Sequence, residues 1–312
     1  MPDYAPIIVS VYNRYDHLKR CIEALRQNPL AKESDLFILS DAPFCEAHTE
    51  KIEEIRTYSR NIEGFKTVTP FFREKNKGAH NSITEGIRTV LERYDTFIFL
   101  EDDIVVSNDF LQYMNEGLAY YQKEETVFSI CGYKMPFPLP ENYRKDIFFY
   151  PCNSPWGFGC WKDRWMKVNL EYFNRYSEIK VRREMRKFTS IGFFIKGILQ
   201  ADSRKEINAT DLRVYYHMFR HNLCSVFPVV SKTQNWGFDG TGEHCGNKNY
   251  EWCKPPLDTS HDATRFEPFS GYDRQILMNY RRFQEKINGG VIAKYLKYTW
   301  IHDCYKKIRK RR

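Results

Sequence analysis

Three consecutive acidic residues follow the most strand-like segment of the sequence. Residues Thr96 to Leu100 are β-branched, aromatic or aliphatic and predict a buried strand, which leads directly into Glu101, Asp102 and Asp103. Like charges this close repel one another unless a cation lies among them. Mg²⁺ and Mn²⁺ bind to one or two carboxylates, with phosphate and water completing the shell. The segment therefore predicts a metal site that could neutralise a diphosphate leaving group; the alternative is a solvated acidic turn.

The acidic residues lie within a regular alternation of strand and helix patterns over the first 130 residues. Short apolar runs at 7–11, 36–39, 65–72 and 96–100 predict strands. Apolar residues at helical spacing predict three helices between them: Leu18, Cys21, Ile22 and Leu25; Ile52 and Ile55, capped by Thr49; and Ile83, Ile87, Val90 and Leu91. This rhythm predicts an α/β fold with a mostly parallel sheet, whose ligands bind at the carboxyl ends of the strands.

The pattern changes after Val127. Strand candidates at 127–131, 147–150 and 225–231 are separated by loops rich in Pro and Gly, and the charged segment 182–187 predicts a solvated helix face. No internal repeat and no low-complexity linker is visible in the sequence.

Three segments resemble a known family. Phe97 to Tyr113, which reads FIFLEDDIVVSNDFLQY, resembles the metal-binding segment of the first N-acetylglucosaminyltransferase of the N-glycan pathway and its bacterial family-2-like relatives. Pro6 to Arg14 is similar to their first nucleotide-binding unit, and Trp156 to Trp165 to their acceptor-side segment rich in Trp and Gly. The likeness covers roughly residues 6–245. It implies an inverting glycosyltransferase of the GT-A type, with a Rossmann-like sheet flanked by helices.

The resemblance implies roles for the acidic segment and for three residues elsewhere. Asp103 takes the place of the metal ligand, Asp102 that of the ribose contact, and Glu101 that of the donor-sugar contact. The remaining donor contacts implied are Asp41 on the uracil ring, Arg14 beside the base and His80, which lies 21 residues before Glu101. The implied donor is a UDP-sugar bound with Mn²⁺ or Mg²⁺.

The resemblance also points to the general base and to a loop over the donor. Asp211, within Asn208 to Leu212, matches the segment that carries the base. The alternative is that Asp211 is only a helix N-cap. Asp163 and Asp239 are the reserve candidates for the base, to be considered if Asp211 is not the base. Asn235 to Cys245 has three glycines within six residues and matches a segment that orders over the donor diphosphate. We therefore include Thr241 and Gly242 among the donor contacts, against the alternative of a plain surface loop.

These assignments divide the chain into three parts. Residues 1–130 are predicted to be the nucleotide-sugar-binding half, residues 131–255 the acceptor-side half with the base and the loop, and residues 256–312 a helical extension with a basic tail.

The net charge of +8 is concentrated in that tail. Between Lys294 and Arg312 there are eight basic residues and one acidic residue, so the first 293 residues carry only +1. This balance argues against a nucleic-acid partner. Aromatic and aliphatic residues between the basic ones predict peripheral contact with an anionic membrane, or else a helix packed on the domain. With a tail that contacts a membrane, we expect the acceptor of the transfer reaction to be a glycan or lipid-linked glycan in bacterial surface-polysaccharide assembly.

The nine cysteines and the beginning of the sequence favour a cytoplasmic location. The cysteines are odd in number and form no CxxC pair, which fits reduced thiols; a zinc site at His244, Cys245 and Cys253 matches no common spacing. No signal-peptide pattern and no run of about 18 apolar residues is visible.

Three other functional classes fit the residues less well. A sugar nucleotidyltransferase would need a glycine-rich loop after the first strand, where this chain has Tyr12 to Tyr15. A phosphohydrolase would need more His and Asp ligands at the strand ends, and a nucleic-acid-binding protein is suggested only by the tail.

Overall fold

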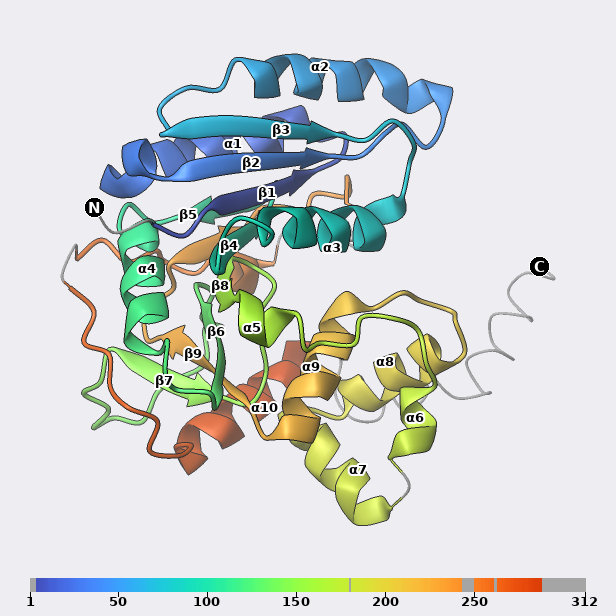
Figure 1. The fold of residues 1–312 in the computed structure, drawn as a ribbon. Coiled ribbons are helices and arrows are strands. Elements are labelled where there is room, and N and C mark those ends of the chain that lie inside the picture. Colours follow the sequence, from blue (N-terminus) through green and yellow to red (C-terminus); the bar gives the residue numbers. More distant parts are fainter. Residues whose placement is uncertain (1–3, 180, 243–249, 261–262, 288–312) are drawn as a thin grey trace.

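The computed structural model describes residues 4–179, 181–242, 250–260 and 263–287, and its centre is one eight-stranded sheet (Figure 1). The strands lie in the order β3-β2-β1-β4-β8-β6-β9-β7. Their bounds are β1 Ile7–Val11, β2 Asp35–Ser40, β3 Thr67–Phe72, β4 Thr96–Glu101, β6 Val127–Cys131, β7 Ile147–Tyr150, β8 Phe158–Trp161 and β9 Cys224–Pro228. A separate antiparallel pair joins β5 (Ile104–Val106) to β10 (Thr233–Asn235).

The sheet is mixed but mostly parallel, as expected. β1 pairs in parallel with β2 and β4, and β3 continues this block beyond β2. β8 runs antiparallel between β4 and β6, and β7 runs antiparallel on β9. β8 was not predicted as a strand: it lies inside the segment that the sequence assigned to the acceptor side. All four of its residues are buried, so its sequence lacks the alternation of apolar and polar residues that marks a half-exposed strand.

Helices cover both faces of the sheet. On one face, α1 (Tyr15–Arg26), α2 (Thr49–Arg60) and α4 (Phe110–Tyr120) pack on side chains such as Ile98 and Leu100 of β4. On the other, α3 (Gly78–Val90), α9 (Thr210–His221) and α10 (Arg274–Ile287) pack with Phe97 and Phe99. Successive residues of a strand point to opposite faces. Glu101 therefore points, like Phe97 and Phe99, to the face that carries α3 and α9.

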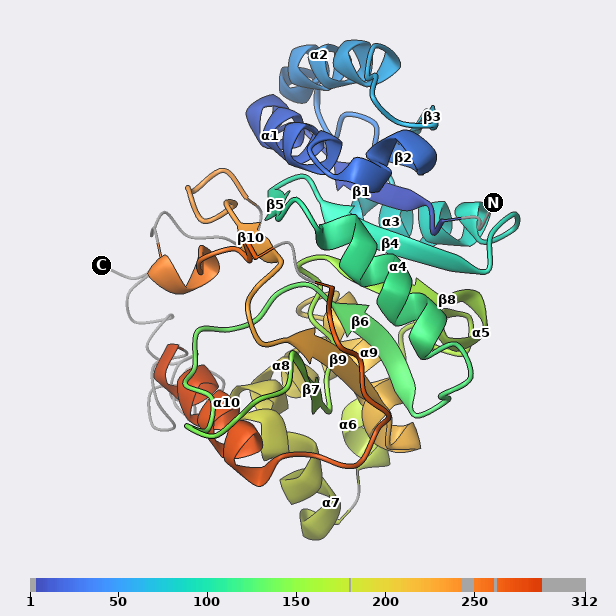
Figure 2. The ribbon, with the colours of Figure 1, turned by 90° about the vertical axis from the view of Figure 1, so that its left-hand side faces the viewer.

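The segment between the Trp-rich stretch and α9, which offered few landmarks in the sequence, forms short helices beside α9 (Figure 2). They are α6 (Arg175–Glu178), α7 (Arg182–Phe188) and α8 (Phe194–Ser203), with a 3₁₀ turn at Thr189–Ile191. The short helix α5 (Lys162–Trp165) ends the Trp-rich stretch itself, and further 3₁₀ turns lie at Pro29–Glu33, Glu46–His48 and Glu251–Cys253. α7 is the predicted charged helix, and its polar face is exposed.

Three details differ from the sequence expectations. Thr49 is the first residue of α2 and does not cap it, because the preceding turn Glu46–His48 carries the backbone directly into the helix and leaves His48 at the cap position. β9 ends at Pro228, three residues before the expected end, although the N–H of Val229 still donates to the carbonyl oxygen of Asp146 at 2.9 Å. The boundary expected at residue 130 falls inside β6, so the two predicted halves share one sheet and remain a prediction about roles.

The described part of the chain holds no helix that is both long and apolar enough to span a membrane. Among the described cysteines whose burial is given, only Cys45 is exposed. His244, Cys245 and the basic tail from residue 288 onward lie outside the described residues.

Candidate active site

β4 delivers the acidic segment to the carboxyl edge of the sheet. Residues Phe97 to Leu100 are buried in the two cores, and the strand ends at Glu101. A turn at Asp102 and Asp103 then leads into β5, so both side chains lie at the strand tip, 2% and 4% exposed. The alternative of a solvated acidic turn does not hold at these two residues, because their carboxylates are buried.

Arg14 neutralises part of this buried charge. It follows β1, the neighbouring strand, and its guanidinium binds Asp102 through two nitrogens and lies 3.0 Å from Oδ2 of Asp103. Burial raises the pKa of Asp102 to about 7, although Arg14 opposes this effect. The two strands therefore bring together three residues that the sequence predicted for the donor site.

Asp103 keeps one oxygen without a partner. Its Oδ2 lies beside Arg14, but its Oδ1 is buried and has no hydrogen-bond partner among the residues that the structure describes. A buried anionic oxygen is costly unless a cation or donor meets it. Within the described ranges, no three His, Cys, Asp or Glu side chains converge as a ready-made metal site. A lone carboxylate oxygen fits a metal that is held mainly by a diphosphate and water.

Gly237 closes tightly over Asp103. The β10 strand pairs with β5, and the residue after it, Trp236, donates its backbone N–H to the carbonyl oxygen of Asp103 at 2.9 Å. A Cβ placed on Gly237 would lie 2.0 Å from Oδ2 of Asp103, which is far inside contact distance. The loop after β10 can therefore approach the acidic turn only with glycine at this position.

Asp211 lies close to the acidic segment from the other side. It is the second residue of α9, which begins at the carboxyl edge of the sheet, and its side chain is exposed. The pKa of Glu101 is raised well above its usual value by burial and by the charges of Asp103 and Asp211. The structure thus brings the predicted base within charge-interaction range of the predicted donor contacts, although the two segments are about 110 residues apart. Asp211 is not the N-cap of α9, since Ala209 occupies that position.

His80 connects α3 to the start of α9. Its Nδ1 is hydrogen bonded to Oγ1 of Thr210 at 2.6 Å, and its Nε2 faces Nη1 of Arg213 at 3.3 Å. Arginine can only donate, so Nε2 accepts and Nδ1 carries the proton. The pKa of His80 is lowered by burial and by Arg213, which agrees with a neutral ring. His80 therefore contacts the residue next to Asp211.

A family comparison identifies the class of protein to which this site belongs. A model of glycosyl transferase family 2 matches residues 7–201, more than half of the chain. The chain belongs to this family. The expectation of a GT-A glycosyltransferase is confirmed by this match together with the mostly parallel sheet and its two helical layers.

Solved glycosyltransferase structures are similar to this glycosyltransferase at low identity. GalNAc-T7 with UDP, GalNAc and Mn²⁺ is 10% identical, with a TM-score of 0.47, over 72% of this chain and 42% of that one. S. aureus TarS is 13% identical, with a TM-score of 0.38, over 73% and 35%. The mannosyltransferase PcManGT from Pyrobaculum calidifontis, in complex with GDP-Man and Mn²⁺, is 9% identical, with a TM-score of 0.39, over 69% of each chain. The glycosyltransferase spans less than half the length of the first two, and the search of curated proteins gives no match.

Asp41 has a clear structural role in the glycosyltransferase. It follows β2 and is buried, and both of its carboxylate oxygens accept from the backbone N–H of Lys77, while Oδ1 also accepts from Ala42. These bonds fix the segment that leads into α3. A carboxylate offers about four acceptor positions, so Asp41 keeps room for one more donor.

The loop after β10 crosses the start of α1. Asp239 binds Nε2 of His17 at 3.2 Å and accepts from the backbone N–H and the hydroxyl of Thr241, which is exposed. His17 lies one turn after Arg14, so the loop passes beside the acidic turn. Thr241 and Gly242 end this described stretch, and residues 243–249 of the expected donor loop lie outside the described residues.

The two reserve candidates for the base, Asp163 and Asp239, lie at different edges of the sheet. Asp163 lies in α5, directly after β8, and Trp161 of β8 pairs with Thr96 at the amino end of β4. Asp163 is therefore at the opposite edge of the sheet from Glu101. Asp239 remains at the correct edge, but it is engaged with His17.

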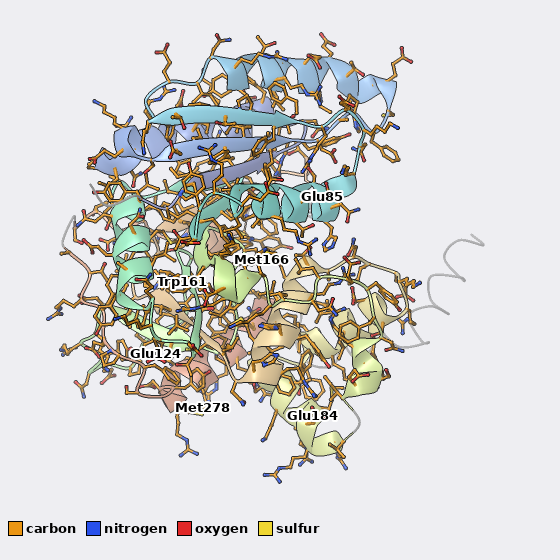
Figure 3. All side chains as sticks on the ribbon, in the orientation of Figure 1. Glu85, Glu124, Trp161, Met166, Glu184 and Met278 are labelled. Carbon is orange, nitrogen blue, oxygen red and sulfur yellow. The ribbon has the colours of Figure 1, made fainter. Side chains whose placement is uncertain are left out.

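The Trp-rich segment contributes mostly to the core. Trp161 donates its ring N–H to the carbonyl of Leu118 and lies inside the packed body beside α4, as Figure 3 shows, and Trp165 packs on Phe97. Only Trp156 is partly exposed, and it stacks on Trp252. Of the three tryptophans in this segment, only Trp156 is accessible to a ligand, and the acceptor-side role of the segment stays a prediction.

Sequence reasoning missed three residues that organise the site. Thr210 and Arg213 hold His80, and Arg213 is held in turn by Asp202 at 3.2 Å. Thr210 lies in the segment that was singled out for Asp211, but no spacing in the sequence joins it or Arg213 to His80, about 130 residues earlier. Gly237, which was within the expected loop, could have been singled out only from its contact with Asp103.

Proposed function

We propose that this glycosyltransferase moves a sugar from a nucleotide diphosphate sugar, a UDP-sugar, to an acceptor hydroxyl with inversion, and that it requires Mn²⁺ or Mg²⁺. The observation that carries the proposal is the unpartnered buried oxygen of Asp103 at the tip of β4, beside Glu101 and Asp211. When bound, the metal ion would neutralise charge on the diphosphate. Asp103 would hold it, and Arg14 would keep Asp102 oriented for the ribose.

In this reaction the acceptor oxygen forms a bond to the anomeric carbon as the bond to the diphosphate breaks. Asp211 takes the proton of the acceptor hydroxyl, and the nucleoside diphosphate leaves with the bonding electrons. Two features support Asp211 in this role. It is exposed at the carboxyl edge, where a substrate can approach, and it is separate from the carboxylate proposed to hold the metal.

Incubation with a panel of nucleotide sugars and Mn²⁺ tests the proposal. We expect release of a nucleoside diphosphate, without pyrophosphate, that stops when a chelator removes the metal. A thermal-shift screen identifies the donor, because a ligand at 100 times its Kd adds about 2.7 kcal/mol to the free energy of unfolding. Pyrophosphate release would instead indicate a nucleotidyltransferase.

Replacing Asp41 with alanine should weaken binding of UDP and of the UDP-sugar equally, since both carry the base that it is proposed to contact. The variant should also lose about 1–3 kcal/mol of stability, because the N–H groups of Lys77 and Ala42 lose a charged acceptor. Calorimetry measures the affinities, with Asp41→Asn as the control that keeps an acceptor oxygen. Equal affinity for the folded alanine variant and the wild type would remove Asp41 from the site.

Gly237→Ala should reduce metal-dependent turnover by about tenfold or more, since the new methyl group must displace Asp103 or the loop. Affinity for UDP should fall much less when metal is absent. Titrations with and without Mn²⁺, together with the thermal midpoint, separate a local effect from unfolding. Wild-type Mn²⁺ dependence in this variant would show that the Asp103 carboxylate does not need its present position.

We further propose, from the sequence of the tail alone, that the enzyme binds anionic membranes peripherally at the cytoplasmic face and acts on a lipid-linked glycan in surface-polysaccharide assembly. Each Lys or Arg near such a surface contributes about 1 kcal/mol. Deletion of residues 294–312 should abolish co-sedimentation with anionic vesicles, and salt should weaken it in the full chain. Neutral vesicles are the control, and an intact chain that ignores anionic vesicles at low salt would contradict this proposal.

A further inference from the structure

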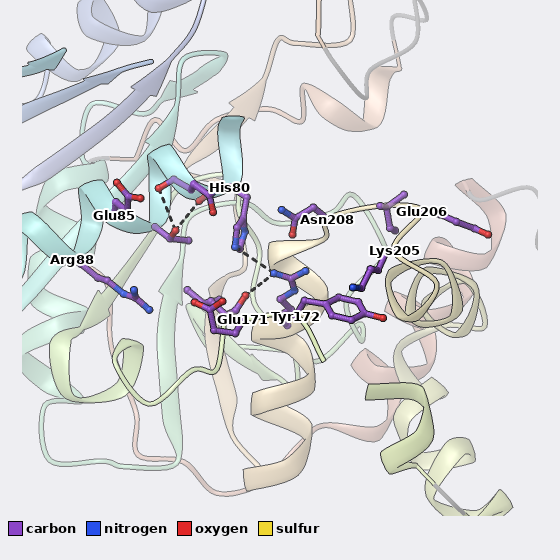
Figure 4. A pocket seen from close by; sticks show the side chains of 13 residues that line it. His80, Glu85, Arg88, Glu171, Tyr172, Lys205, Glu206 and Asn208 are labelled. Carbon is purple, nitrogen blue, oxygen red and sulfur yellow. Dashed lines mark hydrogen bonds between the residues drawn. The ribbon is translucent and has the colours of Figure 1, made fainter. Parts of the chain in front are cut away.

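A polar cavity of about 520 Å³ opens beside the start of α9 (Figure 4). One wall is a single face of α3, where His80, Thr84 and Arg88 follow one another at intervals of four residues. The opposite wall comes from the segments before α6 and before α9. The cavity is lined by His80, Asn81, Thr84, Glu85, Arg88, Leu170, Glu171, Tyr172, Lys205, Glu206, Ile207, Asn208 and Arg213.

The cavity adjoins the proposed base. Its lining residue His80 is bonded to Thr210, the neighbour of Asp211, and its lining residue Arg213 lies two positions after Asp211. Glu101, on the donor side, is affected by the charge of Asp211. The first turn of α9, which carries Asp211, therefore adjoins the cavity through Thr210 and Arg213 and is in charge-interaction range of the acidic segment. An acceptor in the cavity would lie next to the helix end that carries the proposed base.

The charges of the lining are balanced. Three basic and three acidic residues line the cavity: Arg88, Lys205 and Arg213, and Glu85, Glu171 and Glu206. Several are already paired, since Glu85 binds Lys77, Glu206 binds Arg204 and Arg213 binds Asp202. In the described part of the chain, neither Arg88 nor the carboxylate of Glu171 forms an ion pair. A lining of this kind offers hydrogen-bond donors and acceptors without attracting a strongly charged ligand.

An aromatic ring completes the wall. Tyr172 is 38% exposed, and its hydroxyl donates to the carbonyl of Ser203 at 2.6 Å, which fixes the ring. The ammonium group of Lys205 lies 4.6 Å from the ring centre, and Lys205 adopts a left-handed backbone conformation, with φ 58°. A fixed, partly exposed ring beside hydrogen-bonding groups is suited to the flat face of a sugar.

We propose that this cavity is the acceptor subsite and that it takes an uncharged oligosaccharide, with Tyr172 as the stacking surface and Arg88 and Glu171 as partners for sugar hydroxyls. The inference rests on the proposed transfer reaction and adds to it the place and the chemical class of the acceptor. The volume of the cavity lies within the range of sites for small ligands, about 300–1,000 Å³.

An array of immobilised neutral and anionic oligosaccharides, probed with the full chain in the presence of UDP and Mn²⁺, tests this inference. We expect binding to neutral glycans that Tyr172→Ala weakens by about tenfold or more. Tyr172→Phe, which keeps the ring and loses only the bond to Ser203, should lose clearly less than the alanine variant. Tyr176→Ala is the matched control, because Tyr176 is a similarly exposed tyrosine, 37%, outside the cavity lining.

Three results would overturn the inference: binding by the folded Tyr172→Ala variant equal to the wild type, an equal loss in the phenylalanine variant, or wild-type binding to anionic glycans only or to none. Calorimetry with UDP and Mn²⁺ on the same proteins keeps the two proposals apart. Metal-dependent UDP binding that is retained while the array fails rejects the acceptor subsite alone, whereas its absence in the wild type rejects the transfer reaction itself.

Discussion

Asp103→Ala should lose turnover by roughly 10²- to 10³-fold or more and should no longer bind the donor more tightly when Mn²⁺ is added. The reason is the buried Oδ1 of Asp103, which has no hydrogen-bond partner among the described residues and which we assign to the metal. Removing the carboxylate also takes one negative charge from the acidic turn and leaves Asp102 as the remaining acidic contact of Arg14. The turn then repels the diphosphate less, so the variant should bind UDP without metal at least as well as the wild type.

Asp95→Ala is the matched control for this variant. Asp95 is an exposed aspartate just before the amino end of β4, the same strand that carries Asp103 at its other end. It should keep wild-type metal dependence. Turnover that Mn²⁺ still stimulates in the Asp103 variant would show that another group holds the metal.

Asp211→Asn should keep metal-dependent donor binding while kcat falls by about 10²- to 10⁴-fold, the usual loss when a general base is removed. The asparagine has the same shape, so Leu212 and the rest of α9 should stay in place. Loss of a negative charge in the first turn should lower the free energy of unfolding by no more than about 1 kcal/mol. Single-turnover kinetics and UDP calorimetry separate the two effects.

The two reserve aspartates serve as controls in this experiment. Asp163→Asn should have a wild-type kcat, since Asp163 lies at the opposite edge of the sheet. Asp239→Asn should alter the contact with His17 but leave the chemical step intact. If kcat falls in the Asp239 variant and not in the Asp211 variant, the base is Asp239 and α9 only shapes the site.

The parallel part of the fold could be predicted from the sequence because its signals are local. A buried parallel strand such as β4 is a continuous apolar run, and helices such as α1 show their apolar stripe. β5, β8 and β10 are three or four residues long and were missed, whereas the equally short β7 was predicted because IFFY is a continuous run of apolar and aromatic residues. Pairing between residues far apart leaves no pattern in either segment.

Part of the candidate site could also be predicted from the sequence. Arg14, Asp102 and Asp103 follow adjacent strands, so the carboxyl-edge rule and the resemblance together indicated them. For His80, the sequence indicated a donor contact, whereas the structure also gives it a bond to Thr210. That bond depends on how α3 and α9 pack against each other, and no pattern in the sequence indicates this packing.

The interleaved strand order has a consequence for dissecting the enzyme. β6 pairs only with β8 and β9 among the described strands, and both follow it in the chain. A fragment that stops after Cys131 would therefore contain an apolar strand with no partner, and it would expose one edge of β4. Unpaired apolar edges promote aggregation, and pairing across long loops slows folding. We therefore expect that the part predicted to bind the nucleotide does not fold as an independent module, and that split or chimeric versions of this enzyme need to exchange the whole sheet.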